Sequence, residues 1–112
     1  MKKIEAIVRE ERLSAIKEAL EEKGYFGTTV SHVQGRGRQR GLRLQKRSGE
    51  FEVDLIPKIK IELVVLDEDT TVVVRALVQS ARTGGIGDGK IFVLPVEDAV
   101  RIRTGEDGMD AV

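Results

Sequence analysis

The hydrophobic pattern of the sequence shows the same order of predicted elements twice: strand, helix, strand. Residues 3–8 (KIEAIV) alternate apolar and polar side chains, residues 10–24 place apolar residues at helical spacing, and residues 28–35 are rich in strand formers. The same order returns over residues 57–66, 67–82 and 90–96. A period of two is typical of strands and a period near 3.6 of helices. The chain is therefore predicted to have an α+β fold, a ferredoxin-like double βαβ sandwich with an antiparallel sheet.

The apolar positions of these segments predict the core. They are Ile4, Ala6, Val8, Leu13, Ile16, Ala19, Leu20, Ile59, Ile61, Leu63, Val65, Val74, Leu77, Val78 and Ala81. Tyr25 and Phe26 are expected to be core aromatics and His32 a packing residue, and a further short strand is expected over residues 100–103 (VRIR). Both helices would cover one face of the sheet. The other face would be substantially apolar and would need covering, for which self-association is the simplest solution.

The composition limits the chain to a few classes of protein. Its 112 residues predict a single domain, residues 1–112. It has no cysteine and one histidine, so disulfides and thiolate metal sites are excluded, and His-dependent catalysis is disfavoured. No apolar run approaches the roughly 20 residues of a membrane span. The N-terminus becomes charged too early for a signal peptide, so we expect a soluble, cytoplasmic protein.

The charges are segregated along the chain, although the formal net charge is zero. Residues 36–47 (RGRQRGLRLQKR) contain six Arg or Lys and no acid, whereas residues 97–112 hold five acids. Such segregation favours a specific local anion as partner. The basic run opens a predicted long loop, residues 36–55, and long loops are usually functional or disordered. We expect this loop to be mobile when free and ordered by a ligand or partner.

Residues 82–92 (RTGGIGDGKIF) nearly spell a nucleotide-binding P-loop. Gly84, Gly89 and Lys90 fit the spacing, but Ile91 stands where a P-loop has the hydroxyl that holds magnesium. A P-loop also follows a strand and opens a helix, the reverse of the order predicted here. Glycines still allow backbone N–H groups to converge on an anion, and Lys90 adds a positive charge. The residues alone leave two interpretations open, a phosphate cradle and a plain helix-to-strand turn.

Other charged residues offer binding groups without a catalytic arrangement. Arg101 and Arg103 would point to one side of a strand and, with Lys90, bind a triphosphate; surface arginines paired with acids are the alternative. Lys58 is either a cation for a carboxylate or a solvated lysine. Asp88 is expected to shape the glycine turn through an Asx-type hydrogen bond rather than to activate water. Because the sequence offers no nucleophile–base pair and no carboxylate cluster for two metals, we do not expect an enzyme.

Five stretches match a known pattern over essentially the whole chain: MKKIEAIV, GRGRQRG, RSGEFEVDLIPKIKIE, ARTGGIGDGKIFV and RIRTGE. In this order and spacing they resemble the PII signal-transduction family of nitrogen regulatory proteins. The resemblance implies a homotrimer of ferredoxin-like subunits that is not an enzyme. It would bind ATP or ADP between subunits and sense 2-oxoglutarate. The family's segments correspond to a T-loop at about 36–55, a B-loop at about 82–90 and a C-terminal segment at about 97–112.

The resemblance also implies ligand-binding residues. Those for the nucleotide are Ile7, Gly27, Thr29, Gly35, Gly37, Arg38, Gln39, Glu62, Val64, Gly87, Asp88, Gly89, Lys90, Arg101 and Arg103. Those for 2-oxoglutarate are Gly37, Gln39, Arg40, Gly41, Lys58 and Gly87. Gln39 would also hold a Mg²⁺ ion between the two effectors, and Arg101 and Arg103 would come from the neighbouring subunit. Because this metal ligand lies on the T-loop, ligand occupancy would set the conformation of the loop.

The resemblance suggests a partner as well. Arg47 matches the family position that plugs the cytoplasmic mouth of an ammonium transporter, so inhibition of such a transporter is the leading hypothesis. A nitrogen-assimilation enzyme or nitrogenase is the alternative partner. Phe51 replaces the commonly uridylylated tyrosine, and Ser48 and Gly49 reverse the order found in members phosphorylated on the later serine. We therefore expect regulation by effectors without covalent modification. Residues 42–46 also differ from common family sequences.

Two functions of other classes are open as well. A nucleic-acid-binding module would use the basic loop, although zero net charge and few aromatic residues count against it. A slow ATPase would use Asp88, and turnover that Asp88→Asn abolishes would support it.

Overall fold

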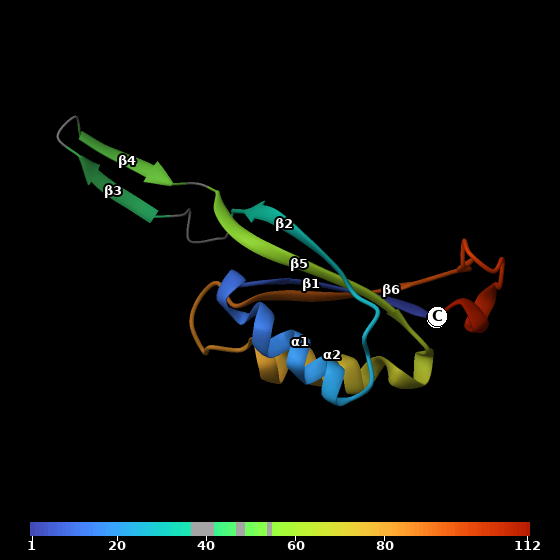
Figure 1. Cartoon of the computed structure of the whole chain (residues 1–112). Helices are drawn as coiled ribbons and strands as arrows, with labels where there is room; N and C mark the ends of the chain where they lie inside the picture. The colour runs from blue at the N-terminus through green and yellow to red at the C-terminus, as the bar shows by residue number, and fades with distance from the viewer. Residues whose placement is uncertain (37–41, 47–48, 54) are drawn as a thin grey trace.

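The structure, a computed structural model, describes residues 1–36, 42–46, 49–53 and 55–112. A four-stranded sheet runs through these residues in the order β2-β5-β1-β6 (Figure 1). Its strands are β1 (Lys2–Val8), β2 (Thr29–Gly35), β5 (Ile56–Val65) and β6 (Gly89–Pro95). Every neighbouring pair of strands is antiparallel. With the two helices described next, this order confirms the predicted ferredoxin-like α+β fold.

Helices α1 (Leu13–Glu22) and α2 (Thr70–Ala81) lie together on one face of the sheet (Figure 1). Each begins after a short 3-10 turn, at Glu10–Arg12 and at Asp67–Asp69. Their buried side chains close over the alternate apolar residues of β1 and β5, as predicted. The buried core consists of Ile4, Ala6, Val8, Ile16, Leu20, Ile59, Ile61, Leu63, Val65, Val73, Leu77 and Ala81.

The buried face of α2 is turned relative to the prediction. Val73 is fully buried, whereas Val74 and Val78 are only half-buried. Because residues 72–74 are three consecutive valines, the sequence does not determine which side of the helix carries the apolar stripe. Packing against the sheet decides which valine points inward. The predicted stripe was therefore partly wrong.

Two residues expected inside are exposed. Phe26 lies in the connection between α1 and β2 and is 72% exposed. His32 lies on the edge strand β2, opposite Ile59, and therefore on the helix side of the sheet. Its exposure means that the helices do not cover this edge. Tyr25, in contrast, packs against the core as expected.

The open face of the sheet, on the side away from the helices, carries a cluster of charges and is not the substantially apolar surface expected. Lys3 Nζ lies 3.1 Å from Glu5 and 3.4 Å from Glu62, and Lys60 Nζ lies 2.9 Å from Glu62. The hydrogen bond from Lys60, together with the charge of Lys3, lowers the pKa of Glu62. The antiparallel register sets Glu5 directly opposite Glu62, where like charges repel, and Lys3 and Lys60 beside this acidic pair offset the repulsion. Apolar residues on the same face are Ile7, Val64, Phe92 and Leu94.

Residues 36–55 contain strands where the sequence predicted a loop. β3 (Leu42–Lys46) and β4 (Gly49–Val53) pair antiparallel as a separate two-stranded ribbon. Figure 1 shows this ribbon beyond the end of the sheet at which β2 ends and β5 begins. The register sets Leu42 opposite Val53 and Leu44 opposite Phe51. Apolar and aromatic residues favour strands at such paired positions, and the long basic run obscured this pattern in the sequence.

The C-terminal segment, residues 97–112, folds back on itself instead of forming a strand over residues 100–103. The N–H of Arg101 donates to the carbonyl of Glu106 at 2.8 Å, and the N–H of Gly105 donates to the carbonyl of Arg101 at 2.7 Å. Gly105, with φ of +74°, closes this turn in a conformation that glycine adopts freely. Arg101 and Arg103 therefore do not share one face of a strand.

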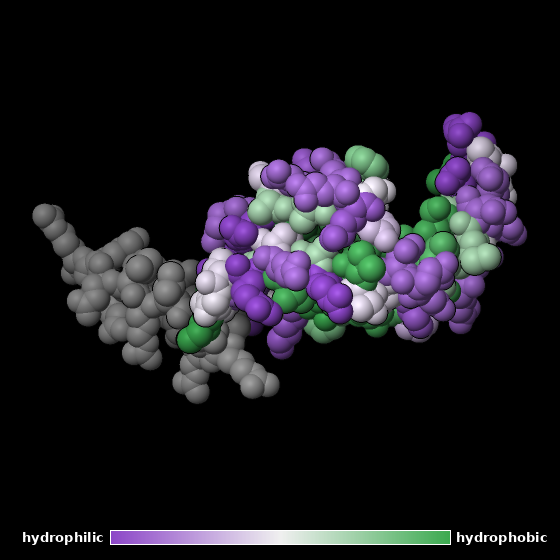
Figure 2. All heavy atoms as spheres, turned by 90° about the horizontal axis from the view of Figure 1, so that it is seen from below, coloured by the Kyte–Doolittle hydropathy of each residue, from purple (hydrophilic) through white to green (hydrophobic). Residues whose placement is uncertain are grey.

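The outward sides of the helices are polar. Figure 2 shows the face that carries them, where hydrophilic residues cover most of the surface and leave smaller hydrophobic areas between them. In the part of the chain that the structure describes, no helix has the length and apolar character needed to cross a membrane.

Candidate functional site

The glycine turn, residues 82–88, connects α2 to β6 beside the end of β1 (Figure 1). Gly84 and Gly87 have φ of +87° and +95°, and Gly89, at the start of β6, has φ of +105°. A Cβ atom at Gly89 would lie 1.7 Å from the carbonyl oxygen of Ile7. A side chain is therefore excluded there both by φ and by space. The exit of the turn is fixed tightly against β1.

Asp88 holds the turn together from within. Its carboxylate accepts hydrogen bonds from the N–H groups of Thr83 at 3.0 Å and Gly84 at 2.9 Å, and from the Thr83 hydroxyl. The donors from Thr83, with further contributions from Arg9 and Gly84, hold the pKa of Asp88 well below its usual range. A carboxylate that accepts several hydrogen bonds stays ionised. Asp88 therefore shapes the turn as expected, but it accepts from residues four and five positions before it and not through the Asx-type hydrogen bond that was predicted.

Arg9 lies against the same turn, and the sequence analysis missed it. Its Nε donates to Asp88 Oδ1 at 3.1 Å, and its Nη2 donates to the carbonyl of Ile86 at 2.5 Å. Gly85 and Gly87 leave room for the guanidinium, because a Cβ at either position would lie 3.3 or 3.4 Å from Nη2. In the sequence Arg9 is a single charge after a strand, which does not distinguish it from a solvated arginine.

Lys58, on β5, reaches the turn as well. Its Nζ donates to the carbonyl of Gly87 at 2.5 Å, and the residue is half-buried. This contact places Lys58 at the turn and leaves both alternatives, a cation for a carboxylate and a solvated lysine, open. A Cβ at Gly35, near the end of β2, would touch the Lys58 stem at 3.6 Å. Through Lys58, the end of β2 and the start of β5 lie near the glycine turn.

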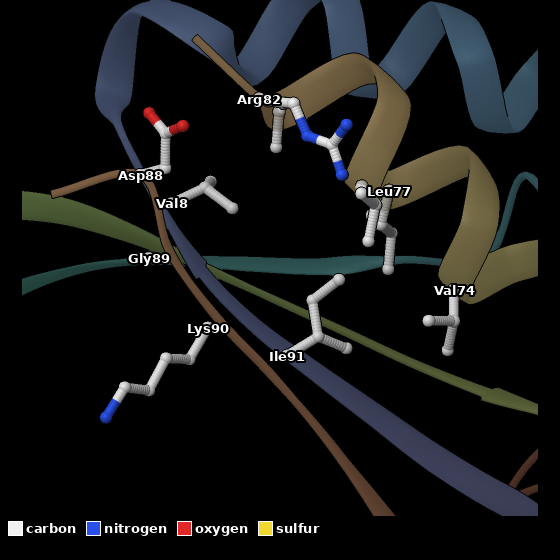
Figure 3. A pocket seen from close by; sticks show the side chains of 10 residues that line it. Val8, Val74, Leu77, Arg82, Asp88, Gly89, Lys90 and Ile91 are labelled. Carbon is white, nitrogen blue, oxygen red and sulfur yellow. The ribbon is translucent and has the colours of Figure 1, made fainter. Parts of the chain in front are cut away.

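Several predicted nucleotide-binding residues lie on the open face of the sheet. The register aligns Ile7 with Lys90 across β1 and β6, and Thr29 with Glu62 across β5 and β2. In Figure 3 the Lys90 side chain points away from α2, whereas Ile91 points toward it. The residues gathered on this face are Ile7, Thr29, Glu62, Val64 and Lys90. They form a surface that leads from the charge cluster to the glycine turn.

A hollow of about 310 Å³ lies between α2 and the start of β6 (Figure 3). Its walls are largely apolar and include Val74, Leu77 and Ile91. Arg82 also lines it, with its guanidinium near Leu77, whereas the Lys90 ammonium points away from the hollow (Figure 3).

Arg101 and Arg103 lie at the opposite end of the molecule from the glycine turn. β6 begins at the turn and runs to Pro95, after which the C-terminal segment follows (Figure 1). Seven strand residues at roughly 3.3 Å each separate the two ends by about 20 Å. Within the described chain, the arginines are not brought to the turn.

Other predicted residues stand apart from the turn or outside the described residues. Gly27 lies in the connection between α1 and β2, where no atom is within 4 Å of an added Cβ. The described ranges hold no group of three or more His, Asp or Glu side chains that could bind a metal ion. The predicted residues that lie outside them are Gly37, Arg38, Gln39, Arg40, Gly41 and Arg47.

The fold and the turn define a ferredoxin-like α+β protein with a braced glycine turn at one end of its sheet. The family described as "Nitrogen regulatory protein P-II" matches residues 1–106. The chain belongs to this family, as its resemblance indicated.

Curated relatives and a solved structure agree with this assignment. Nitrogen regulatory protein P-II 2 of Methanothermobacter thermautotrophicus is 54% identical over 112 residues, which cover 100% of this chain and 97% of the relative. Nitrogen regulatory protein P-II of Azospirillum brasilense is 53% identical over 112 residues, the full length of both. The crystal structure of Arabidopsis thaliana PII bound to citrate matches with a TM-score of 0.82 and 41% identity, covering 99% of this chain and 91% of that one.

Proposed function

We propose that this chain is a nitrogen regulatory signal-transduction protein that binds ATP or ADP and 2-oxoglutarate and controls a partner through residues 36–55. The observation that carries the proposal is the glycine turn. Asp88 fixes its shape, while the N–H groups of Ile86 and Gly87 have no acceptor among the described residues. Unpaired N–H groups in a turn of fixed shape attract anions, which supports the phosphate cradle over the plain turn.

The nucleotide would lie on the open face with its phosphates at the turn. Ile7 and Val64 offer apolar surface to adenine, and Thr29 and Glu62 offer hydrogen-bonding groups to the ribose. Lys90, exposed on the same face, supplies charge for the phosphates. Further proposed contacts are Gly27, Gly35, Gly37, Arg38, Gln39, Gly87, Asp88 and Gly89.

A homotrimer would supply what one chain lacks. Because Arg101 and Arg103 lie at the far end of β6, we expect them to reach the phosphates of a nucleotide held by a neighbouring copy. The exposed apolar side chains of the same segment support such a contact, with Ile102 100% and Met109 70% exposed. In a closed ring each copy gives its arginines to one neighbour and receives those of another.

The second proposed effector is 2-oxoglutarate, a dicarboxylate. The citrate in the Arabidopsis PII structure supports a carboxylate ligand in this family. Lys58 Nζ now donates to the Gly87 carbonyl, and a carboxylate would be a stronger, charge-assisted acceptor. Mg²⁺, held by Gln39, would supply a positive centre shared by the two anions. Backbone groups proposed to complete the site are those of Gly37, Arg40, Gly41 and Gly87.

The proposed output is a change in the segment that carries Arg47. Its leading partner is an ammonium transporter, which the protein would inhibit from the cytoplasm; a nitrogen-assimilation enzyme or nitrogenase is the alternative. Regulation without catalysis fits Asp88, since hydrogen bonds from Thr83, Gly84 and Arg9 engage both of its carboxylate oxygens. A carboxylate held in this way is a poor base for activating water.

The test is calorimetric titration of 2-oxoglutarate with and without Mg²⁺ and ATP. We expect binding only when both are present, because the dicarboxylate needs the metal-bridged site. Lys58→Ala should abolish binding, whereas Lys17→Ala, an exposed lysine of α1, should leave it unchanged. Equal binding in the absence of nucleotide would rule out the bridged site.

A further inference from the structure

Arg9 joins two parts of the glycine turn to the end of β1. Its Nε contacts the carboxylate of Asp88 at 3.1 Å, and its Nη2 contacts the Ile86 carbonyl oxygen at 2.5 Å. The Arg9 side chain is 26% exposed and Asp88 25%, so the pair is shielded from much of the solvent. Hydrogen bonds to charged groups are stronger than neutral ones, and these contacts restrain the turn from the sheet side.

The contact with Ile86 has a directional consequence. A trans peptide unit is planar, and its C=O and N–H groups point to opposite sides. When Arg9 holds the Ile86 carbonyl, it therefore turns the N–H of Gly87 away from itself. This N–H has no acceptor among the hydrogen bonds of the described residues. Gly87, at φ of +95°, adopts this orientation without the strain that a side chain would bring.

We infer that Arg9 is a positioning residue: it fixes the Ile86–Gly87 peptide so that the Gly87 N–H is aimed at an anionic oxygen of the ligand. The inference rests on the proposed binding function of the turn. The anionic oxygen belongs to a phosphate of the nucleotide or to a carboxylate of 2-oxoglutarate. Preorganised donors bind more tightly because the ligand does not have to order them.

Arg12 provides a matched control. It lies three residues further on and also holds a backbone carbonyl, that of Ser80, through Nε at 2.9 Å and Nη2 at 2.5 Å. Ser80 lies within α2, before the turn begins. Arg12→Gln therefore removes an arginine of similar role in packing without touching the Ile86–Gly87 peptide.

The experiment compares the wild-type protein with Arg9→Gln, Arg9→Lys and Arg12→Gln. ATP affinity is measured by calorimetry, and then 2-oxoglutarate affinity at saturating Mg-ATP. The Gly87 amide is followed by NMR in the ligand-free protein. Arg9→Gln should shift the Gly87 amide resonance and weaken ATP or 2-oxoglutarate binding about tenfold, and the ligand affected identifies the anion. Arg9→Lys should recover part of the loss, because its ammonium can hold one of the two acceptors.

The possible outcomes distinguish a failure of the inference from a failure of the proposed function. A wild-type protein that binds no ATP would remove the proposed function and the inference with it. If the wild-type protein binds both ligands and neither Arg9→Gln nor Arg9→Lys changes the affinities, the inference alone is overturned. If binding weakens but the Gly87 resonance does not move, Arg9 contacts the ligand directly. If Arg12→Gln loses as much ligand affinity as Arg9→Gln, the effect is general to arginines at this end of the sheet. Either result overturns the positioning role. If Arg9→Gln does not fold, Arg9→Lys alone decides between these results.

Discussion

The glycine turn and the C-terminal segment lie at opposite ends of β6 and are held in different ways. The turn is tied to the sheet by Arg9 and Lys58 and closed internally by Asp88. Within the described residues, every hydrogen bond and ion pair of residues 97–112 joins that segment to itself. A single chain thus shapes its turn completely. The hydrogen bonds and ion pairs of the described C-terminal segment are all local, and in the proposed homotrimer a neighbouring copy would position it.

The largest expected difference between the two regions is in the stability lost when a glycine is replaced by alanine. Gly89→Ala should lower the free energy of unfolding by about 3 kcal/mol or more, because its Cβ would overlap the Ile7 carbonyl and φ is +105°. Gly105→Ala should lower it by only about 1 kcal/mol, since φ is positive but the space is open. Urea denaturation of both variants measures the two values. Similar losses would mean that β6 moves away from β1 easily, and the contrast between the regions would disappear.

Assembly should depend on the C-terminal segment more than folding does. Ile102→Ser should leave the unfolding free energy of the isolated chain within about 0.5 kcal/mol, because Ile102 is 100% exposed. If a neighbour covers it in the proposed homotrimer, the same change should weaken each interface by about 1.5 kcal/mol or more. Light scattering over a dilution series measures the assembly. Val72→Ser, at an exposed valine of α2, is the control and should leave the oligomer intact. An Ile102→Ser trimer as stable as the wild type would remove this segment from the interface.

The smallest expected effect is the response of the turn to acid. The folded-state pKa of Asp88 lies below its unfolded value, so its contribution to the turn is fully present above about pH 4 and is lost as the pH falls through the depressed folded-state pKa. The Gly84 amide, which donates to Asp88, should keep its NMR chemical shift down to about pH 3. Asp88→Asn should show no such titration. A Gly84 midpoint near the ordinary aspartate pKa would mean that the turn is not held as described.

The periodicity of the sequence predicted the sheet, both helices and most of the core, because alternation and helical spacing record which side of an element is buried. It failed where packing chooses between equivalent residues, as at Val73 and Val74. It also failed for residues 100–103, where strand-forming residues are folded into a turn that Gly105 closes.

The glycine turn was partly predictable. Its glycines and Asp88 are local in the sequence, and local hydrogen bonding to an aspartate is a recognisable pattern. Arg9 is 79 positions from Asp88, and no local pattern links a lone arginine to a turn so distant in the chain. The charge cluster of Lys3, Glu5 and Glu62 was equally hidden, because only the strand register reveals which charges become neighbours.

The length of β6 makes the proposed sensor responsive to its own abundance. Because a strand separates the proposed phosphate-binding turn from the two arginines, the proposed pocket would be complete only while protomers are associated. Dilution below the dissociation constant of the oligomer would then reduce the apparent affinity for nucleotide even though no side chain had changed. A cell that makes more of this protein would thus raise both the number of sensor molecules and the fraction of them that can bind nucleotide.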